Sequence, residues 1–309
     1  MMLRVLSLIA IALLVSCGQH GGGKVTLLID WQPEPTYIGL YYAAEQGYFA
    51  ERGVDIQFEN SWGSVQATKA VSVGKYKIAT SSGGATILSR NYTDNVVSLL
   101  ELYPEIPSAL YSFQNTPLAK PSDIYGKKVG IYPGSVNTHE FDAFVKANGL
   151  DRKKFEVVPI SGADIPLLKA GNIDMALNYT EMSANLASTD ESLNVNELHL
   201  RDFGVRSVGL NLITSSGFLS EGAGVVRGVV EAVKNGYREG CSNRRQAVAA
   251  FLKSNASVPK NHAMSGWNKV CDELYSPSID REASWSRTIK MYSRLGLLKT
   301  EVDTADVIR

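Results

Sequence analysis

Short apolar runs alternate with helix-period segments along the first two hundred residues of the chain. Val25–Asp30 has the character of a strand, and Pro33 and Pro35 then force a turn because proline is excluded from a helix interior. Aromatic and aliphatic residues recur at helical spacing over Tyr37–Tyr48, and Val54–Glu59 follows as the next strand. The opening segment is therefore a predicted strand, turn, helix and strand.

The same alternation continues to about residue 214. The further strands we expect are Tyr76–Thr80, Val96–Leu102, Ser108–Phe113, Lys128–Ile131, Phe155–Ile160, Asp174–Leu177, Leu198–Phe203 and Gly209–Thr214. The helices expected between them are Ser64–Ser72, Ala85–Arg90, Thr138–Asn148, Ile165–Ala170 and Met182–Ala187. Beyond them the pattern changes to amphipathic helices, at Ala223–Glu239, Arg244–Ser254 and Glu282–Leu295, with Asn261–Val270 as a candidate fourth. Strands that alternate with helices predict an α/β fold.

Two runs, near Ser112–Pro117 and Arg206–Leu210, have the character of crossovers between two lobes. Two crossings make the second lobe an insertion in the first. We therefore expect lobe I to comprise residues 24–113 together with 209–309, and lobe II to comprise residues 114–208.

Four strand-to-helix turns are candidate ligand sites: Trp31–Thr36, Ser81–Gly84, Pro133–Thr138 and Asn178–Glu181. In open α/β sheets, ligands bind outside the carboxyl ends of the strands. If the two lobes face each other, these turns converge on one site.

Three side chains in these turns suit a planar, nitrogen-rich ligand. Trp31 lies outside the apolar run and is expected to stack on a flat ring. Tyr179 is a candidate for the opposite face of that ring, and its alternative is an exposed loop tyrosine. Glu181 offers two acceptor oxygens to an amine and a ring N–H, whereas its alternative role is to stabilise a helix dipole.

The remaining candidates have equally ordinary alternatives. Tyr37 is expected either at the ligand or in the core, because a helical stripe of aromatics is a common core signature. Ser81, Ser82, Gly134 and Ser135 would donate to ligand oxygens, although many strand-to-helix turns are rich in serine and glycine without binding anything.

Composition excludes several classes of function. The chain has 309 residues, 44% of them hydrophobic, which is enough for two packed lobes. Lysine plus arginine equals aspartate plus glutamate at 31 each, and no basic run occurs, so no nucleic-acid partner is expected. The four histidines have no ligand spacing, and no G-x-S-x-G or Walker motif is present, so we expect no metal, no cofactor and no catalytic residue.

The first residues resemble an export signal. Residues 1–16 contain Arg4 and then the apolar run Val5–Val15, as in a signal peptide. Leu14–Cys17 resembles the bacterial lipobox, in which the cysteine is lipidated, and the alternative is an ordinary signal peptide with a chance cysteine. Residues 17–23 then form a glycine-rich tether to the membrane. The expected location is the periplasm or the cell surface.

Two further cysteines remain, Cys241 and Cys271. An even pair in an oxidising compartment is compatible with a disulfide, and equally with two buried thiols.

Three stretches carry a family resemblance. They are DWQPEPTYIGLYYAAEQGYFAERGVDI, PSDIYGKKVGIYPGS and AGNIDMALNYTEMSANL. Their order and spacing over 25–186 resemble bacterial solute-binding proteins related to thiamine-pyrimidine synthesis and import. The resemblance implies a type II periplasmic binding protein, with two doubly wound α/β lobes joined by a two-strand hinge.

The resemblance also implies a function. Proteins of this type are monomers that deliver a small-molecule ligand to the permease and ATPase subunits of an ABC importer. Family ligands include thiamine-precursor pyrimidines (hydroxymethylpyrimidine or formylaminopyrimidine), with relatives for riboflavin, sulfonate, taurine and nitrate.

The same superfamily contains a fungal pyrimidine synthase, which has a lysine and a histidine in the turn that corresponds to Thr80–Arg90. Ser81 and Ala85 stand at those places here, and the cysteine-rich cluster of the fungal enzyme is absent. We therefore expect a binding protein and not an enzyme. A sensor domain that signals to a membrane kinase is a third alternative, because fold does not fix function.

Overall fold

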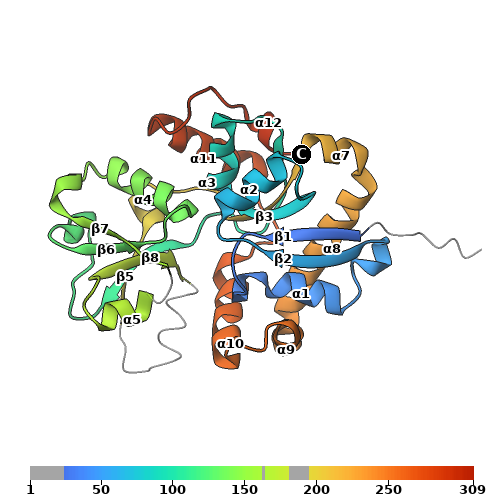
Figure 1. Ribbon diagram of the computed structural model, residues 1–309, viewed down its shortest axis with the longest axis horizontal. Coiled ribbons are helices and arrows are strands. Elements are labelled where there is room, and N and C mark those ends of the chain that lie inside the picture. Colours follow the sequence, from blue (N-terminus) through green and yellow to red (C-terminus); the bar gives the residue numbers. More distant parts are fainter. Residues whose placement is uncertain (1–23, 162–163, 181–194) are drawn as a thin grey trace, which may run out of the picture.

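The computed structural model describes residues 24–161, 164–180 and 195–309, which form two lobes, each built on a five-stranded sheet (Figure 1). The first sheet has the order β2-β1-β3-β10-β4. Its strands are β1 Lys24–Ile29, β2 Asp55–Asn60, β3 Ile78–Ser82, β4 Val96–Glu101 and β10 Leu210–Ser215. The second sheet has the order β7-β6-β8-β5-β9. Its strands are β5 Ser108–Phe113, β6 Lys128–Ile131, β7 Glu156–Pro159, β8 Met175–Tyr179 and β9 Val195–His199.

The two sheets share one topology. In each, three parallel strands are followed by one antiparallel strand, which is β10 in the first sheet and β5 in the second. Both antiparallel strands adjoin a crossing between the lobes, because β5 begins the second lobe and β10 resumes the first. β5 therefore belongs to the second sheet, and the predicted boundary after residue 113 is wrong: the chain crosses before Ser108.

Helices cover both faces of the first sheet because side chains alternate along its strands. Leu27 and Ile29 of β1 pack into the cluster that contains α1, α8 and α9, whereas Leu28 packs with Ala67 and Val71 of α2. The helices around this lobe are α1 Ile38–Glu45, α2 Ser64–Ser72, α3 Gly83–Leu88, α7 Ser216–Glu221, α8 Ala223–Ser242, α9 Arg244–Ser254, α10 Lys260–Lys269, α11 Arg281–Arg294 and α12 Thr304–Val307. This is the doubly wound arrangement expected from the sequence.

The second sheet is covered in the same way by α4 Val136–Ala147 and α5 Asp164–Lys169. Val129 and Met175 pack with Phe141 and Phe144 of α4. The alternate residue of β8, Ala176, packs on the other face, in the cluster that contains Leu168 of α5.

The C-terminal helices complete the first lobe. α8 lies against α1 so closely that a Cβ at Gly236 would come 2.2 Å from the carbonyl oxygen of Gly39, so glycine is required there. A disulfide joins Cys241 at the end of α8 to Cys271 in the π-helical turn Val270–Leu274, with 5.3 Å between the Cα atoms. Of the two alternatives for this pair, the structure contains the disulfide.

The two crossings are held together by one buried carboxylate. Glu140 of α4 is fully buried and accepts hydrogen bonds from Ser108 Oγ (2.5 Å) and Ser207 Oγ (2.9 Å). Ser108 begins β5 and Ser207 lies in the segment that returns to β10, so one side chain of the second lobe contacts both connections.

Some predicted elements differ from the structure. The strand expected at Leu198–Phe203 is β9 at Val195–His199, followed by the 3₁₀ turn Leu200–Phe203. β3 runs through Ser82, so Ser81 and Ser82 belong to a strand and not to a turn.

Several predictions fall outside the described residues: the signal peptide at 1–16, Cys17 and its tether, Glu181, and the helix expected at 182–187. Within the part of the chain that the structure describes, no helix is long and apolar enough to cross a bilayer.

Candidate functional site

The candidate site lies where parallel strands of the two sheets end. Trp31 follows the carboxyl end of β1, and Tyr132 follows the carboxyl end of β6 in the other lobe. Their rings meet edge to face, with centroids 5.7 Å apart and planes at 84°. Trp31 is thus at the interface between the lobes, where open α/β sheets bind ligands.

A small cavity lies beside this contact. We call it the cleft cavity, and it is lined by Asp30, Thr36, Tyr37, Ser81, Ser82, Tyr103, Ile106, Pro107, Tyr179 and Leu210. Its free volume is about 10 Å³, which holds about one water molecule. A heteroaromatic ring needs far more space, so it fits only if the lobes move apart.

Asp30 is the one charged residue among the ten that line the cleft cavity, and it is buried, with 6% of its surface exposed. Its carboxylate accepts hydrogen bonds from Tyr37 Oη (2.9 Å), Ser64 Oγ (2.5 Å) and Thr80 Oγ1 (2.6 Å). Burial, and then the charge of Asp30, raise the pKa of the Tyr37 phenol well above its ordinary value. Tyr37 is therefore a permanent donor that orients the carboxylate.

The two serines of β3 line the same cavity but already have partners. Ser81 Oγ lies 2.8 Å from Thr68 Oγ1, and Ser82 Oγ accepts a hydrogen bond from the Ala85 N–H at the start of α3 (3.2 Å). In this conformation both hydroxyl groups form hydrogen bonds within the protein.

The turn after β6 supplies Gly134 and Ser135. Gly134 has a φ of +72°, where a side chain would be strained, and no atom lies within 4 Å of where its Cβ would be. Ser135 is buried and donates to the Tyr132 carbonyl oxygen (2.8 Å). Neither residue lines the cleft cavity, although Gly134 approaches Gly63 of the first lobe.

Tyr179 ends β8 and brings the second lobe to the cleft cavity. Its backbone N–H is held by Asn178 Oδ1 at 2.8 Å. Its phenol is near enough to Tyr37 to contribute to the raised pKa of that group.

Besides Asp30, the structure adds three residues that the sequence pattern did not indicate. Tyr132 precedes the Pro133 turn and faces Trp31. Asp164 is buried and accepts from Tyr111 Oη and from Asn178 Nδ2 (3.0 Å). Trp62 is 66% exposed beside Gly63. In the sequence, the only feature that could have indicated these three residues was their position just outside predicted strands and helices.

The charge around this interface is negative. Burial first, and then Asp164 and Glu34, raise the pKa of Tyr132, so both carboxylates act on that ring. None of the ten residues that line the cleft cavity is lysine or arginine. Glu34 in turn has a basic partner, because its Oε2 lies 3.0 Å from His262 Nε2. No cluster of three or more potential metal ligands occurs in the described ranges.

Comparison with known proteins gives a family and several relatives. The NMT1/THI5-like family profile matches residues 34–247. The riboflavin-binding protein RibY of Chloroflexus aurantiacus is 23% identical over 91% of this chain and 83% of its own length. A formylaminopyrimidine-binding protein of Halalkalibacterium halodurans is 24% identical over 79% of this chain and 76% of its own.

An enzyme also matches, over less of the chain. The 4-amino-5-hydroxymethyl-2-methylpyrimidine phosphate synthase THI13 of Saccharomyces cerevisiae is 24% identical over 50% of this chain and 45% of its own. Among solved structures, the periplasmic aliphatic sulphonate-binding protein SsuA from Escherichia coli superposes with a TM-score of 0.72, at 17% identity, over 93% of this chain and 92% of its own. That likeness shows the fold, which is that of periplasmic binding proteins.

Proposed function

This chain belongs to the NMT1/THI5-like family, and from that premise we propose that it is an extracytoplasmic solute-binding protein of an ABC importer. The ligand we propose is a neutral heteroaromatic nutrient, first of all a thiamine-precursor pyrimidine such as hydroxymethylpyrimidine or formylaminopyrimidine. The observation that carries this proposal is a cleft cavity with a buried carboxylate, three tyrosines and no lysine or arginine.

The charge of the cleft supports a neutral or donor-rich ligand over an anion. In the described residues the Asp30 carboxylate accepts from three hydroxyls, which leaves about one lone pair to accept from an exocyclic amine. A sulfonate or nitrate would face the same carboxylate, and an unpaired buried charge is costly. Sulfonate, taurine and nitrate are therefore disfavoured, although sulfonate-binding proteins share the fold.

Riboflavin is the second candidate, because RibY matches nearly the whole chain. Its ring system is also flat and uncharged. Both ligand classes assign the same role to Trp31, which would stack on the ring once the lobes separate, while Tyr179 would approach from the second lobe. In this proposal Ser81, Ser82, Gly134 and Ser135 supply secondary polar contacts, and Glu181 supplies a second carboxylate.

We propose binding without chemistry. Ser81 and Ala85 are both buried in the wall beside the cleft, and neither offers the amine or the imidazole that the fungal synthase pattern has there. Incubation with pyridoxal phosphate and iron is expected to give no pyrimidine product. Product formation would overturn this point.

The proposed assembly follows from the same reading. Cys17 is lipidated and holds the protein at the membrane, and the monomer delivers its ligand to a permease and an ATPase. Mass spectrometry of the N-terminal peptide tests the anchor, since a lipidated Cys17 adds the mass of acyl chains. An unmodified Cys17 in protein purified from membranes would contradict it.

The deciding experiment is native mass spectrometry of gently purified protein, followed by titration with candidate ligands. We expect one retained small molecule per chain. Hydroxymethylpyrimidine, formylaminopyrimidine or riboflavin should bind with a Kd in the micromolar range or below, and a hundredfold excess over Kd should stabilise the fold by about 2.7 kcal/mol. Binding of taurine or another sulfonate, with no binding of any ring, would overturn the proposal.

A further inference from the structure

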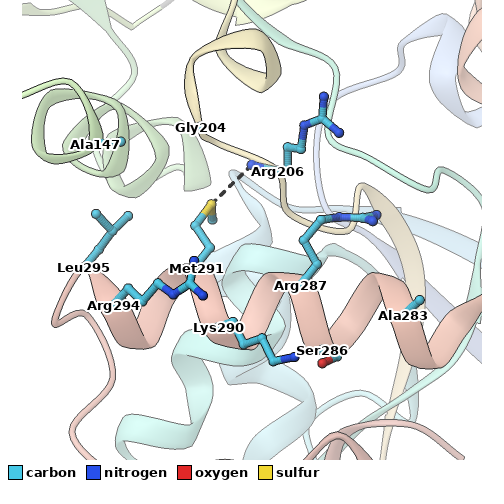
Figure 2. A pocket seen from close by; sticks show the side chains of 10 residues that line it. All are labelled: Ala147, Gly204, Arg206, Ala283, Ser286, Arg287, Lys290, Met291, Arg294 and Leu295. Carbon is cyan, nitrogen blue, oxygen red and sulfur yellow. Dashed lines mark hydrogen bonds between the residues drawn. The ribbon is translucent and has the colours of Figure 1, made fainter.

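A second and much larger cavity lies away from the cleft. We call it the α11 groove, and it has a volume of about 580 Å³. It is lined by Ala147, Gly204, Arg206, Ala283, Ser286, Arg287, Lys290, Met291, Arg294 and Leu295 (Figure 2). None of these residues lines the cleft cavity. The volume lies in the range of about 300–1,000 Å³ that is typical of small-molecule sites.

Four side chains give the α11 groove a strong positive charge. Arg287, Lys290 and Arg294 project from α11, and Arg206 comes from the segment that returns from the second lobe (Figure 2). Within the described residues, the one carboxylate that forms an ion pair with any of them is Glu105, 3.7 Å from Arg206 Nη1 and 3.6 Å from Arg287 Nη2. One ion-paired carboxylate does not balance four cations, so the lining is positively charged.

Two of these cations have no acidic partner. Lys290 and Arg294 form no ion pair among the described residues, whereas Arg206 and Arg287 share a single carboxylate. Arg287 Nε is buried without a hydrogen-bond acceptor.

The base of the α11 groove is apolar. Met291 and Leu295 of α11 and Ala147 at the end of α4 form it, and the Met291 sulfur is fixed by the Arg206 backbone N–H at 3.2 Å. A site with an apolar base and several charged side chains in its lining suits an organic anion better than a bare ion. The lining also joins both lobes, because Ala147 belongs to the second lobe and α11 to the first.

We propose that the α11 groove binds a small organic anion that carries two or more phosphate or carboxylate groups. The groove is bordered by three segments and belongs to a chain of zero net charge without a basic run, which argues against an extended polyanion as its ligand. Guanidinium groups match phosphate and carboxylate oxygens in a two-pronged geometry, and lysine adds a point charge.

The test is isothermal titration of the full-length protein with citrate and, separately, with inorganic pyrophosphate at matched ionic strength. The groove variant is Lys290→Gln with Arg294→Gln, which leaves the Glu105 contacts intact. The matched control is Arg227→Gln with Arg245→Gln, two exposed cations of α8 and α9 with no ion pair in the described residues. It removes the same charge elsewhere.

We expect one site per chain for at least one probe, with affinity reduced at least about tenfold in the groove variant and unchanged in the control. Preference for citrate or for pyrophosphate would identify carboxylate or phosphate as the recognised group. Absence of binding by both probes would overturn the proposal. So would an equal loss of affinity in the two variants, because the effect would then reflect total charge. Neither result bears on the cleft ligand.

Discussion

The cleft cavity and the α11 groove are both bordered by segments that cross between the lobes, yet they have opposite charge and very different volume. The cleft cavity contains a buried carboxylate and about 10 Å³ of space, whereas the groove contains four cations and about 580 Å³. Charge and volume therefore select different molecules: a ring with N–H donors that must part the lobes in the first, and an anion in the open second site.

The two regions also differ in how their polar groups are satisfied. Asp30 in the cleft accepts from three hydroxyls, and its surroundings are fixed before any ligand arrives. Arg206 and Arg287 of the groove share one carboxylate at 3.6–3.7 Å, whereas Lys290 and Arg294 have no acidic partner in the described residues. Preorganisation in the cleft favours specificity, whereas unpaired cations favour any ligand of the right charge.

The largest expected effect concerns Glu140, which connects both crossing segments. Burial raises its pKa from 4.5 to about 7. The unfolded chain then ionises before the folded one, so the contribution of this carboxyl to stability is complete below pH 4.5 and is lost as the pH rises to about 7. Across that range the loss is on the order of 3 kcal/mol.

Glu140→Gln should abolish that loss, because an amide does not titrate. Denaturant unfolding of both proteins near pH 5 and near pH 8 measures it, and the variant should gain on the wild type at the higher pH by up to about 3 kcal/mol. Parallel pH dependence in the two proteins would show that Glu140 does not ionise on unfolding.

Asp30→Asn tests the charge of the cleft. Loss of a charge-assisted hydrogen bond costs about 2–3 kcal/mol, so an aminopyrimidine should bind about 30-fold to 150-fold more weakly. Citrate binding at the α11 groove should be unchanged. Calorimetry measures both, circular dichroism checks the fold, and the exposed Asp202→Asn is the control. Equal pyrimidine affinity in wild type and Asp30→Asn would mean that this carboxylate does not face the ligand.

Substitution of two tryptophans compares a position at the lobe interface, Trp31, with an exposed position, Trp62. Trp31→Ala should weaken ring binding about tenfold or more, because stacking and burial are both lost. The 66% exposed Trp62 offers a matched substitution, and Trp62→Ala should change affinity less than about threefold. Glu181→Ala is expected to resemble Trp31→Ala. Unchanged affinity in both Trp31→Ala and Glu181→Ala would mean that the ligand binds elsewhere.

The smallest expected effect is a difference between the two sites in how their ligand affinity depends on salt concentration. Exposed charges are screened, so raising salt from about 50 to about 500 mM should weaken citrate binding at the α11 groove several-fold. Binding of a neutral ring in the cleft should change little. Titrations at the two salt concentrations measure this difference, and equal salt dependence at both sites would remove the electrostatic contrast between them.

Much of the fold could be predicted from local pattern. The strand at Val25–Asp30, the proline turn after it and the helix at Arg244–Ser254 occur where they were expected, β1 ending one residue early. These features depend on apolar spacing and on proline, which act within a few residues. The strand expected at Leu198–Phe203 was displaced by about three residues, because a short apolar run does not define its own register.

The candidate site could be predicted only in part. Trp31 and Tyr179 could be selected as candidates because each follows or ends a strand at the edge where ligands bind in such folds. Tyr132 was missed because its significance is a contact with Trp31, one hundred positions away. Ser81 and Ser82 were selected as free hydroxyls, whereas packing gave them partners in Thr68 and in the first turn of α3.

By itself, the sequence determined the order of strands and helices, the presence of two lobes and the position of the aromatic turn after β1. Tertiary structure decided that β5 joins the second sheet, that Asp30 is enclosed by hydroxyls, and that Arg206 meets α11 about eighty residues later. The physical reason is range: backbone preference and hydrophobic periodicity act over a few residues, whereas charge and cavity volume arise only when distant segments pack together.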